Sequence, residues 1–260
     1  MSPQVVIITG AASGIGAAIA LSFAKQNAGL CITDKNEEDL NKTSVECHKL
    51  SKTKVLEVVA DLTKNEDLES IVQSAVKEFG KIDVLVNCAG IYEITKLQDP
   101  NIIEQFDKIV GINLRSIVAL TNKALPALIE SKGCIINISS IASSFVTSGS
   151  PIYCLAKAGV TTFTKHAAFE FANFGIRVNC ISPGPVKTNI YKNVGTSNCD
   201  VDTFWDGYID MTLLKKIVKP EEIAELAVYL ASDKATSITG SDFIVDAGML
   251  LTSGIQKNTD

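Results

Sequence analysis

The sequence predicts an α/β protein in which seven parallel strands form one doubly wound sheet with helices on both faces. Three observations predict this class. Short, β-branched apolar runs recur seven times along the 260 residues, and helical segments alternate with them. Most of the runs are apolar throughout, as expected for strands that helices cover on both sides. Such alternation gives right-handed crossovers and places ligands beyond the carboxyl ends of the strands.

The expected strands, in order, are VVIIT (5–9), LCIT (30–33), VLEVVA (55–60), DVLVN (83–87), CIINIS (134–139), RVNCIS (177–182) and DFIVD (242–246). Segments with helical character lie between them, at 14–27, 37–50, 65–79, 102–130, 152–173 and 220–231. One long irregular stretch remains, at about 184–219. The length of the chain fits one domain over residues 1–260. Because unstructured stretches of that length are usually functional, we expect a substrate-binding loop at about 184–219.

Composition limits the function classes. The chain is 46% hydrophobic and 20% charged, which is typical of a globular protein with a buried core. Its 24 basic and 29 acidic residues disfavour nucleic acid or an anionic membrane as a partner. The seven cysteines form no CxxC pair, and no apolar run reaches the roughly 18–20 residues of a membrane span. We therefore expect a cytoplasmic protein with no metal site, since neither histidine has metal-ligand spacing nearby.

A glycine-rich turn follows the first expected strand. In TGAASGIG (9–16), Gly10, Gly14 and Gly16 leave room for backbone to approach a phosphate at the positive end of the next helix. A plain glycine turn is the alternative interpretation. Asp34, 18 residues after Gly16, favours a dinucleotide because a carboxylate there can accept from both ribose hydroxyls. It would repel a 2′-phosphate, which favours NAD over NADP, although Lys35 could soften that discrimination.

Tyr153 and Lys157 lie four residues apart on one face of an expected helix. Either residue alone could be structural. A phenol with an ordinary pKa near 10 is a poor base at neutral pH unless nearby positive charge stabilises the phenolate. Lys157 could supply that charge, so the pair predicts a site of proton transfer.

Further motifs follow in a fixed order: Asp61-Leu62, NCAG (87–90), Asn113, SS (139–140), YCLAK (153–157), PGPVKT (183–188) and DAG (246–248). Together with the glycine-rich turn, the set resembles the short-chain dehydrogenase/reductase family, which has a single Rossmann-type domain. The resemblance runs from Thr9 to about Gly248. The departures are small: Cys88 and Ala247 stand where the family usually has other residues.

The resemblance implies four catalytic residues, Asn113, Ser140, Tyr153 and Lys157. Ser140 would bind the substrate oxygen, Tyr153 would exchange a proton with it, Lys157 would also contact the nicotinamide ribose, and Asn113 would anchor a water that joins Lys157 to solvent. Ser139 is the adjacent alternative to Ser140. The implied cofactor-binding residues are Gly10, Ser13, Gly14, Ile15, Gly16, Asp34, Asp61, Leu62, Asn87, Ala89, Gly90, Tyr153, Lys157, Pro183, Gly184, Val186 and Thr188.

The substrate is expected to be a mid-sized, largely apolar secondary alcohol or ketone, such as a steroid, because the long loop is rich in aromatic and apolar residues. The expected substrate-binding residues are Ser140, Tyr153, Tyr191 and Trp205. Reduction of 3-oxoacyl groups on acyl carrier protein is the alternative activity, and a catalytically silent NAD(H) sensor or scaffold is the alternative of another class. The resemblance also implies a homotetramer.

Overall fold

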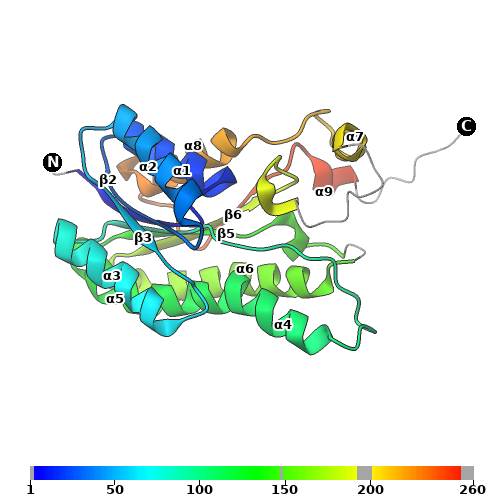
Figure 1. Cartoon of the computed structure of the whole chain (residues 1–260), viewed down its shortest axis with the longest axis horizontal. Coiled ribbons are helices and arrows are strands. Elements are labelled where there is room, and N and C mark those ends of the chain that lie inside the picture. Colours follow the sequence, from blue (N-terminus) through cyan, green and yellow to red (C-terminus); the bar gives the residue numbers. More distant parts are fainter. Residues whose placement is uncertain (1–2, 147–148, 192–200, 253–260) are drawn as a thin grey trace, which may run out of the picture.

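The computed structural model describes residues 3–146, 149–191 and 201–252. It contains a seven-stranded, wholly parallel sheet in the order β3-β2-β1-β4-β5-β6-β7, which confirms the predicted fold class (Figure 1). The strands are β1 (Val5–Thr9), β2 (Gly29–Asp34), β3 (Val55–Val59), β4 (Val84–Asn87), β5 (Cys134–Ile138), β6 (Arg177–Pro183) and β7 (Asp242–Val245).

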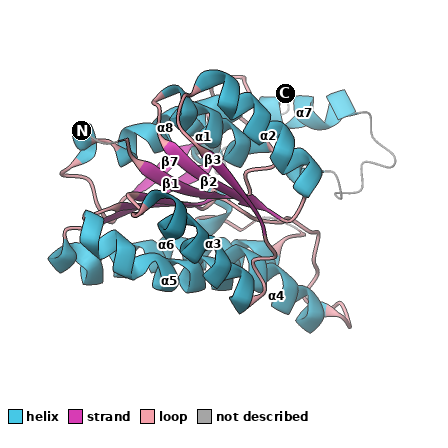
Figure 2. Ribbon diagram, turned by 60° about the vertical axis from the view of Figure 1, so that its left-hand side comes forward, coloured by secondary structure: helices cyan, strands magenta, loops and turns pink. Residues whose placement is uncertain are grey.

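The helices form a layer on each face of this sheet. They are α1 (Gly14–Lys25), α2 (Glu37–Leu50), α3 (Asn65–Phe79), α4 (Ile102–Val110), α5 (Ser116–Ser131), α6 (Pro151–Phe171), α7 (Val201–Asp210), α8 (Pro220–Ala231) and α9 (Met249–Thr252). In Figure 2, α1, α2 and α8 cover one face, and α3, α5 and α6 cover the other. The short α7 and α9 lie at one end of the molecule.

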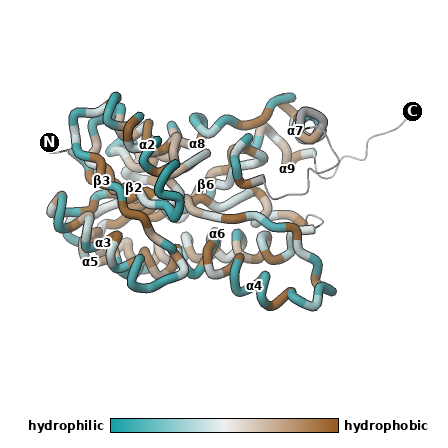
Figure 3. Tube along the Cα trace, viewed as in Figure 1, coloured by the Kyte–Doolittle hydropathy of each residue, from teal (hydrophilic) through white to brown (hydrophobic). Residues whose placement is uncertain are grey.

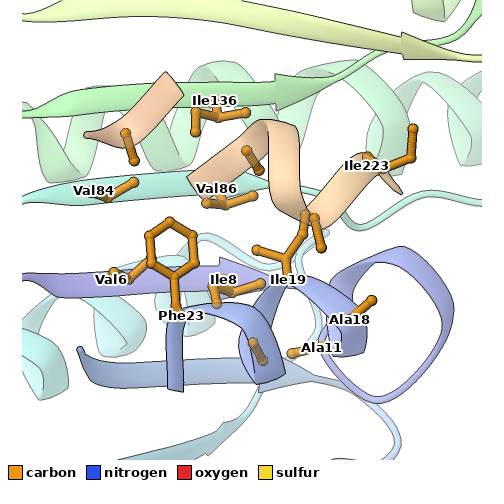
Figure 4. Close-up of a cluster of buried hydrophobic side chains, with 14 of the residues drawn as sticks. Val6, Ile8, Ala11, Ala18, Ile19, Phe23, Val84, Val86, Ile136 and Ile223 are labelled. Atoms are coloured by element: carbon orange, nitrogen blue, oxygen red, sulfur yellow. The ribbon is translucent and has the colours of Figure 1, made fainter. Parts of the chain in front are cut away.

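Strand side chains alternate between two cores because successive residues of a strand point to opposite faces. Val6 and Ile8 of β1 pack in one cluster with Phe23 of α1 and Ile223 of α8 (Figure 4). Ile7 points the other way, into a second cluster built with α3, α5 and α6. Since both faces of β1 are buried, each side chain of the strand must be apolar or have its polar groups hydrogen-bonded, which explains the unbroken apolar run. Figure 3 shows brown, apolar segments along the strands.

Two elements differ from the expectation. The single helix predicted over 102–130 is divided by a π-helical turn at Gly111–Arg115, where the backbone ladder widens by one residue. The stretch predicted to be irregular at about 184–219 contains α7 and the short helical turn Asn189–Tyr191. Within residues 3–146, 149–191 and 201–252, none of the helices is long and apolar enough to cross a membrane.

Candidate active site

A cavity of about 1080 Å³ opens at the carboxyl ends of the strands. The segments that follow β1 to β6 all contribute to its wall, together with α7 and the start of α9. β1 has β2 on one side and β4 on the other, so the chain reverses its direction of winding there. Ligands bind at such switch points because the loops diverge and leave a crevice.

The turn after β1 is built for close backbone approach. Thr9 Oγ1 accepts from the backbone N–H groups of Cys88 and Ala89, at 3.0 and 3.1 Å, so the segment after β4 lies directly against the turn. Gly10 has φ +70°, and a Cβ there would lie 2.7 Å from Ala89 Cα. A Cβ on Gly16 would lie 2.1 Å from the Gly10 carbonyl oxygen. Only glycine fits these two positions.

Helix α1 begins at Gly14, so its free N–H groups and the positive end of its dipole face the cavity. Asp34 lies at the end of β2 on the same wall. Its carboxylate accepts from the backbone N–H groups of Asn36, at 3.0 Å, and Ala12, at 3.3 Å, which fixes its position. A cradle for phosphate and an acceptor for ribose hydroxyls therefore share one wall, and these residues fit a dinucleotide.

Ser140, Tyr153 and Lys157 meet at the opposite part of the cavity. Ser140 follows β5, and the other two lie one helical turn apart near the start of α6. The hydroxyl groups of Ser140 and Tyr153 are hydrogen-bonded to each other. Lys157 Nζ lies 5.7 Å from the centroid of the Tyr153 ring. A substrate hydroxyl or carbonyl oxygen that reached Tyr153 would also meet Ser140.

Burial dominates the electrostatics of this group. Desolvation raises the pKa of Tyr153 to about 12, although the hydrogen bond with Ser140 acts in the opposite direction. Desolvation also lowers the pKa of Lys157 to about 8, because Nζ is enclosed. Desolvation is thus the largest cause of the shift in the phenol pKa. The predicted stabilisation of the phenolate by Lys157 stays a prediction.

Asn113 lies in the π-helical turn and is fully buried. Its side-chain oxygen accepts from Ile91 N–H and its amide donates to the Ile91 carbonyl, both at 2.8 Å. Among the described residues it does not line the cavity. Its side chain therefore fixes the segment after β4, and the predicted role in anchoring a water remains a prediction.

Sixteen of the 17 residues predicted to bind cofactor line the cavity: Gly10, Ser13, Gly14, Ile15, Gly16, Asp34, Asp61, Leu62, Ala89, Gly90, Tyr153, Lys157, Pro183, Gly184, Val186 and Thr188. Asn87 does not. It ends β4 with its side chain buried beneath the sheet, where its amide donates to Asn137 and Thr121. Side chains alternate along a strand, so the next residues form the wall in its place.

Of the predicted substrate-binding residues, Trp205 lies away from the cavity. It is buried, with Lys187 Nζ 6.0 Å from its ring centroid. Phe204 and Tyr208, which lie one helical turn apart on α7 and pack against the Trp205 ring, line the cavity instead. The side chain of Tyr191 falls outside the described residues.

The structure also separates the two candidate serines. Both serines line the cavity, but the Ser139 hydroxyl donates to the Lys157 carbonyl at 3.0 Å, whereas the Ser140 hydroxyl lies beside Tyr153. The sequence analysis did not assign Glu93 and Lys108, which form an ion pair on the cavity wall. No motif marks them, since a charged pair 15 residues apart is ordinary on a surface.

Comparisons with known proteins agree with this architecture. The family model described as enoyl-(acyl carrier protein) reductase matches residues 10–250. The L-fucose dehydrogenase of Bos taurus is 35% identical over 252 residues, which cover 96% of this chain and 91% of that protein. The 3beta-hydroxysteroid dehydrogenase 1 of Eggerthella lenta is 32% identical over 255 residues, 97% of this chain and 96% of that protein.

Solved structures give the same result. The L-sorbose reductase of Gluconobacter frateurii, complexed with NADPH and L-sorbose, is similar with a TM-score of 0.89 and 32% identity, over 96% of this chain and 97% of that chain. The fold and the similarity in sequence thus extend along nearly the whole length of the chain. This chain belongs to the short-chain dehydrogenase/reductase family, whose members are nicotinamide-dependent oxidoreductases of alcohols and ketones.

Proposed function

We propose that this protein is an NAD(H)-dependent oxidoreductase that interconverts a secondary alcohol and a ketone on a mid-sized, largely apolar substrate. The observation that carries the proposal is the meeting of Ser140, Tyr153 and Lys157 at the cavity that also holds the glycine-rich turn. A catalytically silent NAD(H) sensor would need only the glycine-rich turn, to bind the cofactor. The hydrogen-bonded hydroxyls and the buried ammonium are the groups that proton transfer to a substrate oxygen requires.

The residues divide the work as follows. The nicotinamide ring, when bound, takes up or supplies the hydride. Ser140 donates a hydrogen bond to the substrate oxygen and holds it against Tyr153. The phenolic oxygen of Tyr153 gives its proton to that oxygen in reduction and removes one in oxidation. The pKa of Tyr153, about 12, keeps the phenol protonated for reduction, and Lys157 stabilises the phenolate that reduction leaves.

Asp34 supports NAD(H) over NADP(H). Two backbone N–H groups hold its carboxylate at the cavity wall, where a ribose would lie beside it. A 2′-phosphate at that place would meet a fixed negative charge, and such juxtapositions cost several kcal/mol. Lys35, also on the wall, acts in the opposite direction.

The cofactor preference is tested by measuring kcat/KM with NAD and NADP for wild type and Asp34→Ala. We expect wild type to prefer NAD by about tenfold or more, and the variant to lose most of that preference because the repulsion is removed. Asp39→Asn is the matched control, since it also removes one negative charge from this wall. Equal shifts in both variants, or a wild-type preference for NADP, would contradict the assignment to Asp34.

The substrate class is inferred from the wall around Tyr153. Its apolar side chains include Ile91, Ile141, Phe145, Phe204 and Met211. Such a wall suits a hydrophobic body with one polar reacting centre. One relative is named for a steroid and others for sugars, so the apolar wall is what favours the steroid-like class for this chain.

Turnover is tested with a panel of steroid and aliphatic secondary alcohols, sugars and 3-oxoacyl thioesters, following absorbance of the reduced cofactor. We expect turnover of hydrophobic alcohols and a loss of about 10²–10⁴-fold in Tyr153→Phe, with the Kd for NADH little changed. Turnover restricted to sugars or to thioesters would refute the substrate class. NADH binding by both proteins without turnover in either direction would favour the sensor.

A further inference from the structure

The end of β5 holds the start of α6 through polar contacts. Ser139 is 3% exposed, and its hydroxyl donates to the Lys157 carbonyl at 3.0 Å. Thr161, one turn further along α6, donates from Oγ1 to the same carbonyl at 3.3 Å. The two hydroxyl oxygens are 3.0 Å apart, so one hydroxyl can donate to the other while that other donates to the carbonyl. A strand and a helix are thus joined at one point of the helix backbone, the peptide of Lys157.

Lys157 is fixed at its other end by the preceding residue of the strand. Nζ donates to the Ile138 carbonyl at 2.8 Å. Ser140, the next residue after Ser139, is hydrogen-bonded to Tyr153. Three consecutive residues therefore hold three different parts of the site: the ammonium, the backbone of the lysine and the phenol. The middle one, Ser139, also lines the cavity, but its hydroxyl donates to the backbone of α6.

An apolar residue at either position would pack, but it would not fix a register. Hydrophobic contacts are non-directional, whereas a hydrogen bond between buried groups requires one distance and one orientation. A shift of α6 along β5 by a fraction of a turn would separate the buried Ser139 hydroxyl from both of its partners on the helix, the Lys157 carbonyl and Thr161 Oγ1. Unpaired buried polar groups are costly, so the shift is opposed.

We propose that Ser139 and Thr161 are positioning residues, which hold α6 in register with the end of β5 so that Tyr153 and Lys157 face the same substrate oxygen. The inference rests on the proposed function, because it assigns these hydroxyls a part in the reaction that Tyr153 and Lys157 carry out. Thr161 does not line the cavity, and both hydroxyls act through Lys157, to which they are hydrogen-bonded.

The groups that face Lys157 come from three elements. The Tyr153 ring lies on its own helix, and the thiols of Cys88, after β4, and Cys180, in β6, act on it electrostatically. Burial raises the pKa of both thiols to about 12, so both are neutral near pH 8. The Cys180 thiol interacts with Asp242 and with the hydroxyls of Thr164 and Thr161. A titration observed near pH 8 in this group therefore belongs to Lys157.

Four variants test the proposal. Thr161→Val removes the hydroxyl at nearly constant volume, Thr161→Ser keeps the hydroxyl, and Ser139→Ala removes the partner. Thr164→Val is the matched control: Thr164 is a buried threonine on the same side of α6 whose Oγ1 accepts from Asn137 at 2.9 Å and does not contact Lys157. All four are made in the full chain, and each is measured for Tm, kcat, KM and the pH dependence of kcat.

A second readout is independent of turnover. The pKa of Lys157 is followed by NMR in protein made with isotope-labelled lysine, with Lys157→Arg to assign the signal. In Thr161→Val and Ser139→Ala we expect kcat to fall about 10–100-fold, because small displacements of reacting groups have effects of that size. We expect the Lys157 pKa to rise from about 8 toward 10.5 as the looser side chain gains water, and Thr161→Ser to restore both.

Thr164→Val should lower Tm by a few degrees, as loss of a buried hydrogen bond does, and leave kcat and the Lys157 pKa unchanged. The proposal is overturned if Thr161→Val and Ser139→Ala change Tm only, or if Thr164→Val changes kcat and the Lys157 pKa as much as they do. A wild-type protein that turns over no alcohol or ketone would refute the proposed function, and the Lys157 titration would still decide whether the hydroxyls position it.

Discussion

Replacing Lys157 by methionine should make the protein more stable and inactive. The side chain is 3% exposed, and desolvation lowers its pKa from 10.5 to about 8. Below pH 8 the lysine is charged in both the folded and the unfolded chain, and burying that charge costs free energy. The difference between the two pKa values corresponds to about 3 kcal/mol. Methionine has a similar shape and no charge, so it avoids this cost.

The substitution also has a cost. The Ile138 carbonyl loses the hydrogen bond from Nζ, which is about 1 kcal/mol. The net gain at pH 7 is therefore about 2 kcal/mol, or about 4–8 °C in Tm for a chain of this size. Urea unfolding of wild type and Lys157→Met at pH 7 measures the first quantity, and scanning calorimetry measures the second. Lys165→Met, an exposed lysine of the same helix, should change stability by less than about 0.5 kcal/mol.

The pH dependence distinguishes this explanation from better packing of methionine. Between pH 8 and 10.5 the unfolded chain binds a proton at Lys157 that the folded protein has already lost. Wild-type stability therefore rises with pH in this window relative to the variant. The advantage of Lys157→Met should fall through zero, and the variant should become less stable than wild type by up to about 1 kcal/mol at the top of the window, because the lost hydrogen bond remains. An advantage that stays constant from pH 7 to 10, or a variant less stable than wild type at pH 7, would refute the reasoning.

Two further predictions concern the fold around the site. Gly16→Ala places a Cβ 2.1 Å from the Gly10 carbonyl oxygen and should lower the free energy of unfolding by about 1–3 kcal/mol or more. Gly111→Ala is the control, because a Cβ there has nothing within 4 Å and should be neutral; urea titrations compare the two variants directly. Phe23→Ala removes a fully buried side chain from the core between α1 and the sheet, and should lower the free energy of unfolding by about 3–5 kcal/mol by the same measurement. A loss below about 2 kcal/mol would indicate that α1 moves to fill the space left by the Phe23 side chain.

The strands and the cofactor wall could be predicted from sequence because each leaves a local signal. A strand covered on both faces must be apolar at every position, and Gly10 and Gly16 are required by contacts less than 3 Å away. Asp34 follows from its place at the end of β2. These features depend on residues close together in the chain, so a pattern of residue types is enough to find them.

The remaining features depend on which way a side chain points. Trp205 and Phe204 are neighbours of similar character, and only the packing of α7 decides that Phe204 faces the cavity and Trp205 does not. The π-helical turn at Gly111–Arg115 adds one residue to the ladder without changing the apolar pattern that predicts a helix. In the sequence, Ser139 is a second candidate for the serine that binds the substrate oxygen. Only the structure shows that its hydroxyl donates a hydrogen bond to the Lys157 carbonyl.

The opposite effects of burial on Tyr153 and Lys157 link stability to chemistry. Desolvation disfavours the charged form of each group, so it raises the pKa of the phenol to about 12 and lowers that of the ammonium to about 8. At pH 7 the protein holds a neutral phenol beside an ammonium that is still mostly protonated. Oxidation of an alcohol needs the phenolate, and raising the pH to form it also removes the proton from Lys157. Because pH alone cannot supply the phenolate and the ammonium together, the position of Nζ matters: the Ile138 carbonyl accepts from it and favours its charged form, while the Ser139 and Thr161 hydroxyls hold the backbone of Lys157 in place.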